Sequence, residues 1–142
     1  MKKVFHAAAV VLSLCLSAMA SAHFVWVVRN GEKVQVHFSE SAEAPEPELL
    51  KNVASAKVWA LVSGGRGGSK MVEVPLTLTD ESLSGSVDPR ANAVVLSHEY
   101  GVVNKGDSNF LLKYTAKQYA SPLPGQWTAT NDAEHIPLEV TP

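Results

Sequence analysis

The sequence predicts an all-β fold, an antiparallel β-sandwich of seven or eight strands. From His23 onward, apolar and polar residues alternate with a period of two, and turn residues interrupt this alternation about every eight to twelve positions. Short strands with regularly spaced turns are typical of an immunoglobulin-like sandwich, and the chain shows no βαβ pattern and no internal repeat. We therefore expect a single domain of this kind.

Residues 1–22 have the composition of a secretory signal peptide. Two lysines follow the first methionine, residues 4–16 are mostly apolar, and small residues stand just before the expected cleavage point after Ala22. The apolar run is shorter than the roughly 20 residues that cross a membrane. We therefore expect a mature domain of residues 23–142 that is periplasmic or secreted and does not span the membrane after processing.

Processing would also change which ligands the chain offers. It removes Cys15, the only cysteine, and leaves Met71 as the single methionine. A sulfur-rich Cu(I) site and a disulfide are therefore not expected in the mature chain. Without Lys2 and Lys3, the mature chain has 10 of the 12 Lys and Arg residues and all 14 Asp and Glu residues, which gives a formal charge of about −4. This charge gives no indication of nucleic-acid binding.

The first predicted element is a β-hairpin, residues 23–29 and 33–39, around Asn30-Gly31. A two-residue turn at Asn30-Gly31 would pair Phe24 with His37, but would separate the aromatic residues from the valines of the second strand. A three-residue loop ending at Gly31 pairs Phe24 with Val36 and gives one continuous apolar face. We favour the second register, because the hydrophobic face decides strand register.

The remaining elements are predicted from the turn residues and from the alternation of apolar and polar residues. Two prolines in the acidic connection 41–54 exclude a strand, and residues 48–53 could form one or two helical turns. Further strands are expected at residues 58–62, 71–79, 83–87, 93–103, 110–116 and 136–140. The glycine-rich loop 63–69 lacks the Gly-Lys-Ser/Thr ending and the following helix of a phosphate-binding loop, so we interpret it as a hairpin tip.

The candidate metal site begins at the expected new N-terminus. A histidine at a free N-terminus offers its α-amine and its ring Nδ1, which can chelate one ion. In the favoured register His23 and His37 lie directly across from each other, so their nitrogens could meet at one ion. Three nitrogens in a plane suit Cu(II), and less strictly Ni(II) or Zn(II).

Other residues have both a metal-binding and a structural interpretation. His98 shares a predicted face with apolar neighbours, so it is either a packed histidine at the edge of the core or a third ring ligand. Tyr100 would then lie close enough to bind axially. Glu40 and Glu99 are either oxygen ligands or solvated residues at strand ends. His135 lies in a polar loop.

Several stretches together resemble a known family. The stretches are Ala22 to Val28, Val36 to Glu40, Tyr100 to Val102, and Phe110 to Lys117. They resemble exported bacterial β-domain proteins of unassigned function, often described as periplasmic components of nickel or cobalt uptake systems. The resemblance covers nearly all of the mature chain.

The resemblance implies an immunoglobulin-like sandwich, a link to transition-metal handling, and His23 as the first mature residue. It does not imply a fixed histidine at the position of His37. Longer relatives continue past Val140 into a second β-domain, so this chain is a one-domain version or a truncated one. A second likeness is to small periplasmic copper-resistance sandwiches that begin with histidine, although their methionine-rich Cu(I) site is absent here.

These observations lead to competing functional hypotheses. The first is a metal-binding protein that captures or delivers Cu(II), or alternatively Ni(II) or Zn(II), with a membrane transporter or another envelope protein as a partner. The alternative is a metal-free binding or assembly module of the cell envelope. A copper oxygenase is disfavoured because no aromatic substrate platform is evident, and no set of residues typical of a hydrolase is present.

Overall fold

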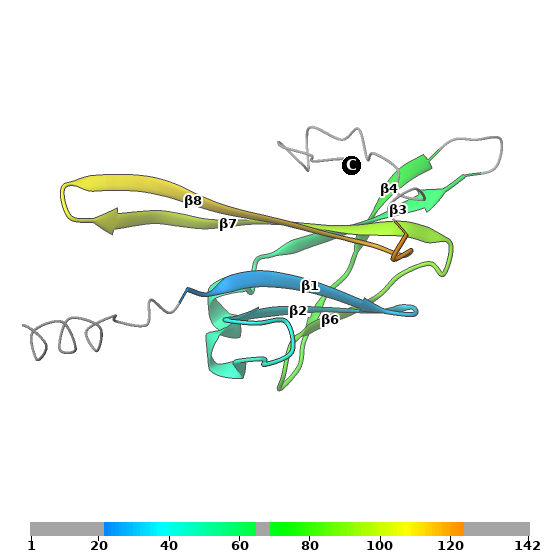
Figure 1. Ribbon diagram of the computed structural model, residues 1–142, viewed down its shortest axis with the longest axis horizontal. Coiled ribbons are helices and arrows are strands. Elements are labelled where there is room, and N and C mark those ends of the chain that lie inside the picture. Colours follow the sequence, from blue (N-terminus) through cyan, green and yellow to red (C-terminus); the bar gives the residue numbers. More distant parts are fainter. Residues whose placement is uncertain (1–21, 65–68, 124–142) are drawn as a thin grey trace, which may run out of the picture.

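The structure, a computed structural model, describes residues 22–64 and 69–123. It confirms the predicted all-β antiparallel sandwich, with two four-stranded sheets and one short helix (Figure 1). The finer immunoglobulin-like topology stays a prediction. The signal peptide before Ala22, the tip of the glycine loop, His135 and the strand predicted at 136–140 lie outside the described residues. No helix in the described ranges is long and apolar enough to cross a membrane.

Each of the two sheets contains strands that are not consecutive in the sequence. The first sheet has the order β1-β2-β6-β5, and the second has the order β4-β3-β7-β8. The strands of the first sheet are β1 (Phe24–Asn30), β2 (Lys33–Ser39), β6 (Leu83–Ser86) and β5 (Thr77–Leu78). Those of the second are β4 (Ser69–Val74), β3 (Lys57–Ser63), β7 (Ala91–Lys105) and β8 (Ser108–Tyr119).

The predicted hairpin forms, but both registers considered from the sequence are wrong. Asn30 pairs with Lys33, so Gly31 and Glu32 form the turn. Gly31 has a φ of 61°, in the left-handed region that glycine adopts without steric cost. Because the turn lies further along the chain, every residue of β1 pairs with a different residue of β2 than predicted, and Phe24 lies opposite Ser39.

The valines of β1, and not its aromatic residues, face the core. Val25 lies opposite Phe38 and Val27 opposite Val36, and all four are buried. On the other face of the sheet, the indole of Trp26 donates a hydrogen bond to the carbonyl of Ser39. Trp26 also makes an edge contact with Phe24, which remains half exposed. The favoured register is wrong because it places the largest apolar side chains of β1, Phe24 and Trp26, on the inward face.

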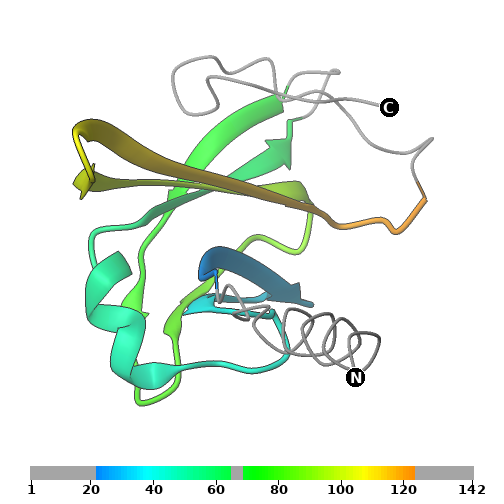
Figure 2. The same ribbon diagram turned by 60° about the vertical axis from the view of Figure 1, so that its left-hand side comes forward.

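A short 3-10 helix, η1 (Pro47–Val53), completes the core between the sheets. It contacts β2 and β7, and Leu50 and Val53 are buried in the same cluster as the inward valines of both sheets. Figure 2 shows the helix lying along one side of the strands. The expected helical turns at 48–53 are therefore confirmed, and their role is to cover one side of the sandwich core.

The strand predicted at 71–79 divides into two strands that join different sheets. β4 ends at Val74 and pairs with β3, whereas β5 pairs with β6. Pro75 stands between them, and a proline cannot donate to a strand ladder. Gly85 of β6 lies so close that a β-carbon there would be 2.6 Å from the carbonyl oxygen of Pro75. This close approach holds the segment that connects β4 to β5, residues Pro75 and Leu76, against β6 of the first sheet.

Arg29 ties the two sheets together where β1 lies beside β8. Its backbone N–H donates to the side-chain oxygen of Gln118 on β8. Its guanidinium donates to the carbonyl oxygens of Ala91 and Pro89, at the start of β7. The end of the hairpin is therefore held by hydrogen bonds to the opposite sheet.

Candidate metal site

The side chain of His23 contacts a carboxylate from another part of the chain. Its Nε2 lies 3.1 Å from Oε2 of Glu46, and both side chains are 31 % exposed. A carboxylate can only accept a hydrogen bond, so Nε2 carries the proton in this contact. If the ring is neutral, Nδ1 then has a free lone pair. Nδ1 is the ring nitrogen that a chelate with the α-amine of His23 would use.

Glu46 is held in place by the residues around it. It lies between Pro45 and Pro47, just before η1, and its backbone carbonyl accepts the N–H of Leu49 at 3.0 Å. Its second carboxylate oxygen, Oε1, accepts the backbone N–H of Glu40 at 3.1 Å. This hydrogen bond is the main reason that the pKa of Glu46 lies below its usual value; partial desolvation opposes the shift, and His23 adds to it. The carboxylate is therefore ionised and oriented at neutral pH.

An aromatic cluster extends from His23 into the space between the sheets. It consists of His23, Phe38, His98, Tyr100 and Tyr114. Phe38 contacts the rings of His23, Tyr100 and Tyr114, with centroids 5.8 to 5.9 Å apart. The hydroxyl of Tyr114 also lies 3.5 Å from the carbonyl oxygen of His23. The pKa of Tyr114 is raised, mainly by burial and further by Tyr100, so the phenol stays protonated and can donate.

His98 lies at the inner side of this cluster. It is only 4 % exposed, its ring stacks on Tyr114 at 6.4 Å, and Tyr100 makes an edge contact with it at 6.2 Å. Its Nε2 lies 3.0 Å from the carbonyl oxygen of Asn52 in η1 and must donate to it. Burial lowers the pKa of His98, so the neutral ring is favoured and Nδ1 keeps a lone pair. This buried Nδ1 has no hydrogen-bond partner among the described residues.

Tyr100 lies at an irregularity in β7. The pairing with β8 passes from Glu99 opposite Lys113 directly to Gly101 opposite Leu112, so Tyr100 is an extra residue in the ladder. A bulge of this kind redirects side chains. Tyr100 faces Phe38 and His98, whereas Val102 beyond the bulge is 67 % exposed. Tyr100 thus lies on the same face as His98, as the alternation of residues predicts, and the alternation no longer holds at Val102.

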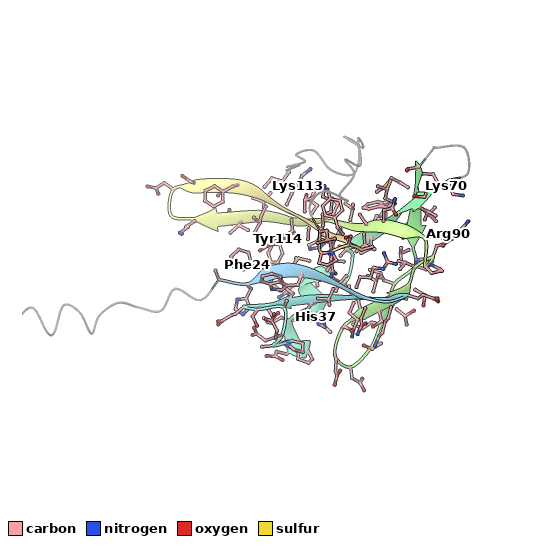
Figure 3. All side chains as sticks on the ribbon, turned by 45° about the vertical axis from the view of Figure 1, so that its right-hand side comes forward. Phe24, His37, Lys70, Arg90, Lys113 and Tyr114 are labelled. Carbon is pink, nitrogen blue, oxygen red and sulfur yellow. The ribbon has the colours of Figure 1, made fainter. Side chains whose placement is uncertain are left out.

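His37 does not join the cluster. It lies opposite Trp26, on the outer face of the first sheet, whereas His23 contacts the inward-facing Phe38. Figure 3 shows Tyr114 between the sheets and His37 on the far side of β2. Burial lowers the pKa of His37, and a hydrogen bond with the backbone of Glu81 partly offsets the shift. The prediction that His37 faces His23 is wrong, because the turn lies one residue further along.

The structure thus brings together three of the four predicted residues, namely His23, His98 and Tyr100. Of the carboxylates considered, Glu40 contributes its backbone N–H to Glu46, and Glu99 pairs with Lys113 at 3.0 Å. Sequence reasoning missed Glu46. No periodic signal could have found it, because it lies in a proline-flanked connection, 23 residues from His23.

No group of three or more His, Cys, Asp or Glu side chains that could hold a metal ion occurs within residues 22–64 and 69–123. The chain matches no protein-family model, no curated protein and no solved structure. The fold is that of an antiparallel β-sandwich, and its function is inferred from the residues themselves.

Proposed function

We propose that this chain, cut after Ala22, is a periplasmic or secreted metal-binding protein that takes Cu(II) at its mature N-terminus. The ligands are the α-amine and Nδ1 of His23. The observation that supports the proposal is the contact between Nε2 of His23 and the Glu46 carboxylate. A role in capturing or delivering the ion follows from the expected export of the protein.

The contact with Glu46 matches what a metal-binding histidine requires. Metal-ligating histidines usually donate their second ring N–H to a carboxylate or carbonyl, which fixes the tautomer and makes the ligating nitrogen more basic. Glu46 would do this for His23 with a carboxylate that is already ionised and held by Glu40. The side chain is also partly open to solvent, so an ion can reach it.

The donor set favours Cu(II) over the other candidates. Among divalent first-row metals, Cu(II) binds a given nitrogen site most tightly, with Ni(II) and Zn(II) weaker. The mature chain offers no thiolate that would favour a softer ion. His98 and Tyr100 belong to the same aromatic cluster, but the proposal does not require them as ligands.

A calorimetric titration of the mature protein with Cu(II) tests this proposal. We expect His23→Gln to lower the affinity at least about a hundredfold, since it removes one arm of the chelate. His37→Gln is the matched control, because it removes an imidazole on the other face of the sheet, and it should bind within about threefold of the parent. Equal affinities for the two variants would remove His23 from the site. N-terminal sequencing of the exported protein should give His23 first.

The alternative is a metal-free binding or assembly module of the cell envelope. It is favoured by the exposed apolar side chains that gather near the end of the β7–β8 hairpin. Elemental analysis of protein purified from the periplasm without added metal separates the two functions. About one copper per chain would support the metal-binding function, and a chain that neither carries nor binds copper would favour the module.

A further inference from the structure

The β7–β8 hairpin extends beyond the sandwich as a two-stranded ribbon. β3 pairs with β7 only as far as Ser97, and beyond this point β7 pairs with β8 alone. We call residues 99–113 the arm; Figure 1 shows its tip reaching past the other labelled strands. Both of its faces carry exposed apolar side chains. These are Tyr100, Val102, Phe110 and Leu111, which are 39 to 67 % exposed.

The arm also has one edge, formed by β8, beside which the structure describes no further strand. Within the described residues, β8 is the last strand of its sheet and pairs only with β7. A two-stranded ribbon is marginally stable in water, and an unpaired edge is a template for another strand. Apolar side chains on both faces and an open edge are together typical of an interaction surface.

The charges on the arm indicate that a second copy of the chain is the partner. If two β8 strands pair antiparallel about Phe110, Phe110 lies opposite the partner's Phe110. In the same register Lys113 lies opposite the partner's Asp107, which stands in the turn just before β8, and symmetry repeats this pair. Moving the centre by one residue, to Leu111, separates these opposite charges. Lys113 already pairs with Glu99 of its own chain, so it would lie between two carboxylates.

We propose that the mature protein forms a twofold dimer in which the β8 edges of two arms pair about Phe110. The contact is isologous and closes on itself, and it joins two four-stranded sheets into one of eight strands. The ribbon is narrow, so the buried area falls at the lower end of specific interfaces. We therefore expect a weak dimer whose population depends on concentration. This inference is independent of the proposed metal site.

Sedimentation velocity of the mature protein over a range of concentrations, with a chelator present, tests the dimer. Asp107→Lys and Lys113→Asp should each raise the dissociation constant at least about tenfold, because each places like charges opposite one another. The double variant should restore it to within about threefold. Loss of the Glu99–Lys113 pair cannot explain these results, because Asp107→Lys keeps that pair and still weakens the dimer. The double variant lacks the pair and still recovers the affinity.

Leu78→Lys is the matched control, since Leu78 is 61 % exposed on β5, away from the arm. It should leave the dissociation constant unchanged, and circular dichroism should show every variant folded. A protein that is monomeric at all concentrations would overturn the proposal. So would a dimer that ignores the single charge reversals, or one that the double variant does not restore.

Discussion

Replacing Glu46 by glutamine should weaken Cu(II) binding although Glu46 is not proposed as a ligand. The carboxylate lies 3.1 Å from Nε2 of His23 and fixes the tautomer in which Nδ1 carries the lone pair. Glutamine keeps the size of the side chain and an oxygen acceptor, but it removes the negative charge. The imidazole would then be less basic and less firmly oriented, so its Nδ1 would be a poorer ligand.

The size of the effect follows from the surroundings of the pair. Loss of an outer partner to a ligating histidine typically costs between about 10-fold and 100-fold in metal affinity. Both side chains are 31 % exposed, so water screens the charge and can replace part of the hydrogen bond. The lower end of this range applies, and we expect the affinity for Cu(II) to fall about tenfold.

Calorimetric titration at pH 7 would measure this change, with Glu48→Gln as the control. Glu48 is exposed in the first turn of η1, so its substitution makes the same change in net charge without contacting His23. Equal affinities for the two variants would refute the reasoning. A loss of more than about a thousandfold would also refute it, because Glu46 would then have to bind the metal directly.

Two further predictions concern the stability of the metal-free protein. Burial lowers the pKa values of His98 and His37 below the 6.5 of the unfolded chain, so the unfolded state binds more protons as the pH falls below about 6.5. The free energy of unfolding should therefore decrease from pH 7 toward pH 5 in urea titrations, and a constant or rising value would be contrary to this. Gly85→Ala should destabilise the fold by about 1–3 kcal/mol, because the new β-carbon would lie 2.6 Å from the oxygen of Pro75 and 2.9 Å from the side chain of Val74. Urea unfolding measures this change too. An unchanged midpoint would contradict the prediction, because it would mean that the segment between β4 and β5 shifts at little cost in free energy.

The sequence by itself determined the elements of the fold. The period of two and the turn residues placed the strands of the hairpin, of β3, and of the long β7–β8 pair close to where they lie. Pro47 and the residues after it indicated the short helix. These predictions succeed because they depend on local backbone preferences and on alternation, which short stretches carry on their own. The signal peptide and the family resemblance stay predictions.

Only the tertiary structure decided which side chains meet. The turn lies at Gly31 and Glu32 rather than at residues that end with Gly31. The resulting register turns Val25 and Val27 inward and leaves His23 against Phe38, away from His37, because strand register depends on which side chains fill the core. The bulge at Tyr100 is a single extra residue that no periodicity marks, and Val102 beyond it is exposed although alternation predicts that it shares the face of His98. Glu46 reaches His23 from a loop distant in sequence. Such contacts arise from the packing of whole sheets, so the candidate site could be outlined from the sequence only at His23, His98 and Tyr100.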